Sequence, residues 1–142
     1  MGVLAVVVSV LPGTHKLYGA ANKLMFDLRY AQQLAISRQV PCGVSFNPAA
    51  NSYFVYIGII ATVATDPHTR GNLSVAYSAG SQYSGIDLVS TNFGDLVYFN
   101  AAGTPYNSIG AALSGQGIIT LQSASGTKTV TIEANTGEVK IP

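Results

Sequence analysis

The chain has 142 residues, of which 9% are charged, and a net charge of +1. This length suits one domain with a sizeable core, and so small a net charge excludes an overall basic field that would attract nucleic acid. Because a typical domain has about 25% charged residues, part of the surface is expected to be covered by lipid or by other subunits. The single cysteine, Cys42, excludes an internal disulfide and any multi-cysteine metal site, and we expect a buried thiol.

The chain opens with an apolar run over residues 2–12, GVLAVVVSVLP. As a helix this run would extend about 15–17 Å, which is half of the roughly 30 Å hydrocarbon core of a bilayer. A signal peptide would place basic residues before its apolar core, and only Met1 and Gly2 precede this one. The run by itself therefore fits neither a complete membrane span nor a secretion signal.

Residues 14–39 are predicted to form an amphipathic helix that stops before Pro41, since proline disfavours helical geometry at the preceding residue. Apolar residues spaced alternately by four and three form a seam on one face: Leu17, Ala21, Leu24, Leu28, Ala31 and Ala35. The other faces hold Lys16, Lys23, Asp27, Arg29, Gln32, Gln33 and Arg38. We expect Arg29 and Gln33 to tolerate alanine within about 0.5 kcal/mol. If residues 2–12 are also helical, Pro12 and Gly13 mark a bend.

After residue 40 the pattern changes to short alternating segments separated by turn residues, which is typical of strands. Candidate strands are residues 43–48, 52–58, 72–78, 85–90, 95–100, 117–123, 128–134 and 137–142. The first two are predicted to form a hairpin, and the short links between the last three favour an antiparallel meander. The predicted fold is α+β, with the helical region at residues 1–39 and a β-rich globular region at 40–142, the second half of the helix packing on an antiparallel sheet.

No set of residues forms a convincing catalytic or metal site. His15 and His68 are far apart in the sequence. Asp66, His68 and Arg70 could form a small polar site, although a solvated loop is favoured. Asp87 and Asp95 could help hold a cation through loop carbonyls, but turn and capping roles are favoured. We therefore expect no enzymatic activity, no cofactor and no metal.

The order of an apolar helical run, an amphipathic helix and an antiparallel sheet resembles that of type IV pilins. Residues 2–12 are similar to the second half of the pilin signature, so the processing glycine and a glutamate would precede Met1, and we expect a longer native N-terminus. Residues 26–46 (FDLRYAQQLAISRQVPCGVSF), 97–107 (VYFNAAGTPYN) and 117–141 are similar to the minor pseudopilins of the GspH/FimT type. Residues 59–93 match nothing in particular.

This resemblance implies a non-enzymatic filament subunit. Such a subunit is inserted in the bacterial inner membrane by one helix, with its domain in the periplasm. It is then cleaved by a prepilin peptidase, methylated, and assembled with other pilin or pseudopilin subunits into a pseudopilus or an extracellular pilus. Small residues allow close helix packing in the filament core, and here they are Gly2, Ala5 and Ser9, with Pro12 at the end of the run. The helix–sheet core would contain Leu17, Leu24, Leu28 and Ala31.

Alternative functions remain open at this point. FimT-type members are DNA-uptake proteins with a C-terminal Gly-Arg-x-Arg motif, at whose place this chain has Gly137, Glu138, Val139 and Lys140. An acidic residue replaces the first cation, which argues against nucleic acid as a partner because phosphate contacts need several cations. A principal pilin is a further possibility, and an adhesin-like module using residues 56–68 is a weaker one.

Overall fold

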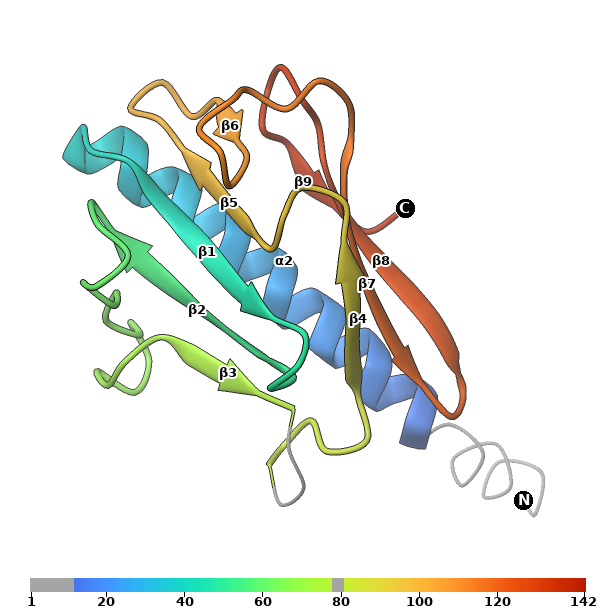
Figure 1. Cartoon of the computed structure of the whole chain (residues 1–142). Coiled ribbons are helices and arrows are strands. Elements are labelled where there is room, and N and C mark those ends of the chain that lie inside the picture. Colours follow the sequence, from blue (N-terminus) through green and yellow to red (C-terminus); the bar gives the residue numbers. More distant parts are fainter. Residues whose placement is uncertain (1–11, 78–80) are drawn as a thin grey trace, which may run out of the picture.

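The computed structural model describes residues 12–77 and 81–142. One long helix, α2 (Pro12–Arg38), runs behind two antiparallel sheets (Figure 1). The strands are β1 (Cys42–Asn47), β2 (Ser52–Ile57), β3 (Ser74–Ala76), β4 (Asp87–Thr91), β5 (Leu96–Phe99), β6 (Pro105–Tyr106), β7 (Gly117–Ser123), β8 (Gly126–Ile132) and β9 (Val139–Lys140). The predicted α+β class is therefore confirmed.

The strands form two sheets where the sequence predicted one. The first has the order β3-β2-β1-β5-β6, and the second has the order β4-β7-β8-β9. The predicted hairpin is β1–β2, in which Cys42 lies opposite Ile57. The predicted meander is β7-β8-β9, with Gly117 opposite Ile132. The chain enters the second sheet at β4, returns to the first at β5 and β6, and then completes the second.

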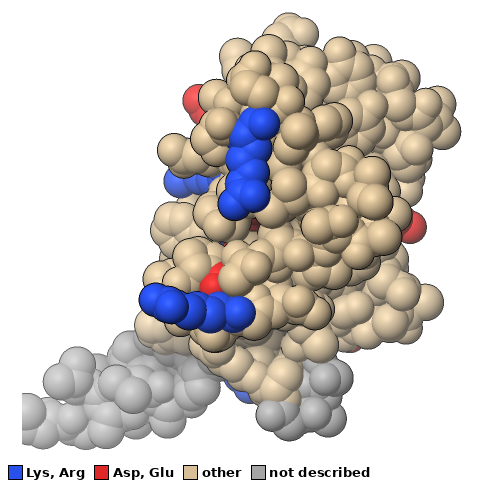
Figure 2. Space-filling view, turned by 90° about the vertical axis from the view of Figure 1, so that its left-hand side faces the viewer, with Lys and Arg blue, Asp and Glu red and all other residues tan. Residues whose placement is uncertain are grey.

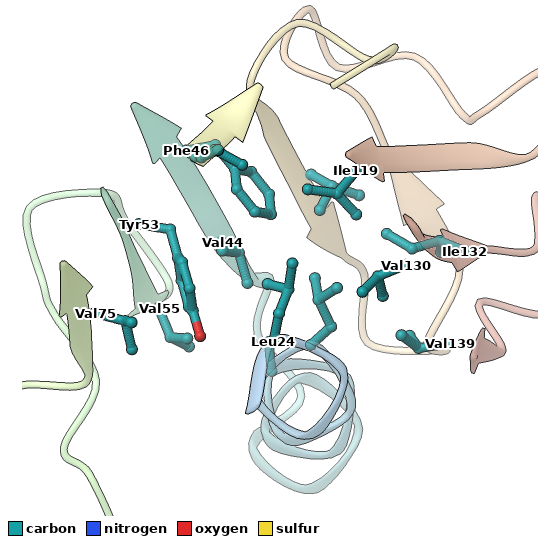
Figure 3. Packing of buried hydrophobic residues seen from close by; sticks show 14 of the residues in the cluster. Leu24, Val44, Phe46, Tyr53, Val55, Val75, Ile119, Val130, Ile132 and Val139 are labelled. Atoms are coloured by element: carbon teal, nitrogen blue, oxygen red, sulfur yellow. The ribbon is translucent and has the colours of Figure 1, made fainter. Parts of the chain in front are cut away.

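The helix is the common support of both sheets. Its inward side is fully or almost fully buried at Leu17, Ala20, Ala21, Leu24, Leu28, Ala31, Leu34 and Ala35. Figure 3 shows the packing: Leu24 on the helix lies beneath Val44 of β1 on one side and Val130 of β8 on the other. Because half of this inward stripe is alanine, the helix backbone can approach the strands closely.

Several strands are shorter than predicted. The segment 72–78 contributes only β3, and 137–142 contributes only β9. The two-residue strand β6 was not predicted, because a proline at its first position reads as a turn rather than a strand. It lies at the edge of the first sheet, where a proline is tolerated. Gly43 in β1 is required by packing, since a Cβ there would collide with the carbonyl oxygen of Val97.

We predict that Leu28→Ala destabilises the protein by about 2–5 kcal/mol, because it removes a fully buried side chain and leaves a cavity between helix and sheets. Gln33→Ala is the matched control on the exposed side of the same helix, where the expected change is within about 0.5 kcal/mol. Urea unfolding of both variants measures the difference. Equal stability of the two variants would contradict the packing described here.

Candidate functional site

Polar residues of α2 hold separate parts of the β-region against the helix. Asp27 is 5% exposed, and its Oδ2 accepts a hydrogen bond of 2.7 Å from the hydroxyl of Tyr53 on β2. Arg29 donates two hydrogen bonds, of 3.1 and 2.8 Å from Nε and Nη2, to the carbonyl oxygen of Val139 in β9. Gln32 donates to the carbonyl oxygen of Gly103, at 2.9 Å. The helix is thereby tied to both sheets by directional contacts as well as by its apolar stripe.

These contacts correct the expectation for Asp27 and bear on that for Arg29. Asp27 was assigned to the polar faces of the helix, and the structure buries it against β2. The sequence indicated this burial through the position of Asp27, three residues after Leu24 and four before Ala31, since residues three and four apart share a helix face. Arg29, expected to tolerate alanine, has two hydrogen bonds to lose.

The Asp27 carboxylate is partly compensated in its buried position. Burial raises its pKa, and hydrogen bonds from Tyr53 and from Lys23, whose Nζ lies 3.0 Å from Oδ1, act in the opposite direction. Figure 3 shows Tyr53 reaching from its strand toward the helix with its hydroxyl foremost. Burial also raises the pKa of the Tyr53 phenol well above its usual value. This cluster is therefore a fixed polar link inside the helix–sheet interface.

A second tyrosine hydroxyl lies close to this cluster. The Tyr77 ring is 6.0 Å from that of Tyr53, centroid to centroid. Its hydroxyl is buried without a hydrogen-bond partner among the described residues. Burial raises the pKa of Tyr77, and the negative charge of Asp27 adds to the effect. A neutral phenol is the only form suited to this position.

The filament-core residues predicted from the sequence fall largely outside the described part. Gly2, Ala5 and Ser9 lie in residues 1–11, and Pro12 is the first described residue of α2. The predicted bend at Pro12 and Gly13 depends on that same segment and stays a prediction. By contrast, the four residues assigned to the helix–sheet contact all lie in the buried cluster: Leu17, Leu24, Leu28 and Ala31.

The C-terminal residues singled out by the sequence have structural roles. Gly137 has a φ of 73°, and a Cβ there would lie 2.5 Å from the carbonyl oxygen of Gly103. Lys140 Nζ lies 3.7 Å from a carboxylate oxygen of Glu133 and 3.7 Å from one of Glu138. The cation of this motif is therefore paired with two acidic residues.

The remaining polar candidates do not converge. Asp87 is the first residue of β4, and Asp95 lies beyond the end of that strand, directly before β5. Asp87 accepts a hydrogen bond from Asn51, and Asp95 bonds with Thr91. Asp66 Oδ1 accepts from the backbone N–H groups of His68 and Thr69, which is a turn arrangement. Across residues 12–77 and 81–142, no group of three or more His, Cys, Asp or Glu residues is placed to hold a metal ion.

Cys42 is buried at the start of β1, as predicted. Its thiol lies 3.7 Å from the carbonyl oxygen of Val40, and burial raises its pKa. A buried thiol with a raised pKa is a poor nucleophile because little thiolate forms. The residue therefore serves packing.

The outward side of the molecule is poor in charge. On the face that Figure 2 shows, a few Lys and Arg side chains and fewer acidic ones stand among wide uncharged areas. On α2, large apolar side chains remain exposed at Tyr18 (50%), Phe26 (59%) and Ile36 (47%). None of the helices in the described residues is both long and apolar enough to cross a membrane. These apolar side chains lie on the same exposed side of the helix as Arg29, so they leave apolar surface there beside one cation.

The opposite pKa directions of two aspartates predict opposite pH dependences. For Asp27, whose pKa is raised by burial, the folded state holds the proton more tightly than the unfolded state. Wild type should therefore lose stability relative to Asp27→Asn as the pH rises above the usual value of 3.8 toward 7. Urea unfolding of both proteins between about pH 3 and pH 7 measures the difference, whose scale is about 1.4 kcal/mol per unit of pKa displacement.

Asp66→Asn is the matched control for this experiment. Hydrogen bonds from the backbone N–H of His68, and then of Thr69, lower the pKa of Asp66. Wild type should therefore lose stability relative to Asp66→Asn as the pH falls through the lowered pKa. If both variants showed the same sign, the burial of the Asp27 carboxylate would not be the source of the pH dependence.

Two solved structures of known proteins have a similar architecture. The solved structure of the type IV minor pilin FimU of Pseudomonas aeruginosa matches with a TM-score of 0.62 and 13% sequence identity, over 91% of this chain and 90% of that one. The minor pseudopilin EpsH of the type 2 secretion system of Vibrio cholerae matches with a TM-score of 0.65 and 11% identity, over 89% of this chain and 96% of that one. At these identities the likeness shows the fold. No curated protein sequence matches the chain.

The family follows from the sequence match. The family model described as type II transport protein GspH matches residues 20–137, which include most of α2 and nearly all of the β-region. This match contains the helical segment with Asp27, Arg29 and Gln32, and it extends to Gly137. The chain therefore belongs to the GspH family of pilin-like proteins.

Proposed function

We propose that the protein is a non-enzymatic subunit of a pseudopilus or type IV pilus-like filament, and that it assembles with other pilin-like subunits through its N-terminal helix. The observation that carries the proposal is the family match together with the position of the apolar run. Residues 2–11 directly precede α2 in the sequence, and Leu17 is the first buried side chain among those described. In the proposal, this apolar run contacts a bilayer or neighbouring helices.

The exposed side of α2 supports assembly by helix packing. Tyr18, Phe26 and Ile36 leave apolar surface uncovered along this helix, while its other side is fully occupied by the two sheets. In the proposal, residues 2–11 continue the helix. They are inserted in the inner membrane before assembly, processed by a prepilin peptidase, and later buried among neighbouring helices. Gly2, Ala5 and Ser9 would allow the backbones to approach closely.

DNA binding is the alternative that the chain fits less well. The C-terminal place of the basic motif holds Lys140, whose ammonium is paired with Glu133 and Glu138. Contact with a phosphate would have to displace these carboxylates. The choice among secretion, motility and DNA uptake, and between a minor and a principal subunit, rests on properties of the whole filament.

The assembly proposal predicts that Ala5→Trp blocks filament incorporation while the domain stays folded, because a bulky side chain prevents close backbone approach. Ala5→Ser is the matched control and should incorporate normally. Incorporation is measured by electron microscopy and by shearing filaments from cells, and folding by circular dichroism. Normal incorporation of a folded Ala5→Trp subunit would show that residues 2–11 act only as a membrane anchor.

The absence of a free basic motif predicts DNA affinity no better than about 10⁻⁴ M at physiological salt. A fluorescence titration with duplex DNA measures this. Lys140→Ala should leave the weak binding unchanged, since its ammonium is already paired. Micromolar binding that disappears in Lys140→Ala would restore the DNA-uptake interpretation.

A further inference from the structure

A cavity of about 400 Å³ lies at the end of the domain where α2 begins. Lys16 of the helix forms one side, the loop residues Ser84 and Gly85 another, and the turn between β7 and β8 a third. Figure 1 shows this turn beside the first residues of α2. Three segments that are distant in the sequence therefore meet at the point where the apolar run joins the domain.

The groups in this cavity suit an anion. Lys16 donates from Nζ to the carbonyl oxygen of Ser84 at 3.2 Å. On another side of the cavity, the hydroxyls of Ser123 and Ser125 are hydrogen-bonded to each other, with 2.8 Å between their oxygens, so one hydroxyl hydrogen of the pair is left for a ligand. None of the described residues that line the cavity is acidic. The carboxylate nearest in sequence to the lining residues, that of Asp87, is turned to a hydrogen bond with Asn51.

A second cation lies on the same end of the domain. Lys128 of β8 places its Nζ 5.7 Å from the centre of the Tyr18 ring, and Tyr18 is 50% exposed. A tyrosine and lysines with apolar stems are the residues that favour the interface between hydrocarbon and water. This end therefore combines two cations, serine hydroxyls and an exposed tyrosine.

The distance between these groups and the apolar run indicates which anion they would contact. Along a helix, Lys16 lies about 6 Å and Tyr18 about 9 Å beyond Pro12, where the run ends. The polar headgroup layer on each side of a bilayer is about 5–8 Å thick. If the apolar run lies in the hydrocarbon core, Lys16 is at the depth of the lipid headgroups, and Tyr18, with Lys128 beside it, is at their outer edge.

We propose that this end of the domain binds the headgroups of anionic phospholipids through Lys16, Lys128 and the hydroxyls of Ser123 and Ser125. The inference rests on the proposed membrane anchoring and adds a lipid preference to it. Before assembly, such binding would hold the domain against the membrane surface. A juxtamembrane cation contributes roughly a fivefold increase in partition toward an anionic membrane, so the contact is strong enough to orient the domain and weak enough to release it.

The test uses the full chain in nanodiscs of phosphatidylcholine, with and without phosphatidylglycerol. Amine-reactive labelling followed by mass spectrometry should show Lys16 and Lys128 protected in the discs with phosphatidylglycerol relative to those without. Lys140 of β9, opposite Thr131 of β8, is the internal control and should react equally in both. This readout needs no mutation and so does not depend on the folding of a variant.

A second measurement follows the equilibrium distribution of the chain between the two kinds of nanodisc. The double variant Lys16→Gln/Lys128→Gln should lose about 20- to 30-fold of the preference for phosphatidylglycerol, whereas Lys140→Gln, with a smaller charge change outside the proposed site, should retain it. Insertion without lipid preference or lysine protection would overturn this inference and leave membrane anchoring intact. Failure to associate with either nanodisc would overturn both.

Discussion

The fold depends on the burial of one helix stripe against two sheets that pair no strands with each other. Strands β1, β2 and β5 and strands β7, β8 and β9 form separate hydrogen-bonded sets, and α2 is in contact with members of both. Leu24 and Leu28 are fully buried where the two sets meet over the helix. Removal of the helix would expose the inner faces of both sheets together, so the helix and the β-region are expected to fold as one unit.

The polar contacts of α2 fix the orientation of the helix on the two sheets. An apolar stripe alone would tolerate sliding or rotation of the helix, because hydrophobic burial is not directional. Asp27 bonds to a side chain of the first sheet, and Arg29 to the backbone of the second. These two contacts from neighbouring positions leave one orientation in which both are satisfied. A carboxylate as buried as Asp27 is costly to retain, which is consistent with a role in specifying the register of the helix.

Local patterns in the sequence predicted the elements well and their long-range pairing poorly. The seam of the helix, the β1–β2 hairpin and the β7–β8–β9 meander each depend on periodicity and short links, and all three are present. The division into two sheets depends on where β4 and β5 pair, which is decided by contacts across the whole chain. Asp27 shows the same limit: its spacing places it on the apolar face, but the sequence does not show that Tyr53, twenty-six residues later, donates a hydrogen bond to its buried carboxylate.

Only 9% of the residues are charged, and several of these few side chains form contacts within the domain. Lys23 pairs with Asp27, Lys140 pairs with Glu133 and Glu138, and Arg29 binds a carbonyl oxygen. These cations serve the domain itself, and the outward face is left largely uncharged (Figure 2). Covering such a surface costs little, because few ions must be desolvated. Low charge is therefore compatible with a subunit whose sides are covered in an assembly. On so uncharged a surface, Lys16 and Lys128 distinguish one end of the domain from the other.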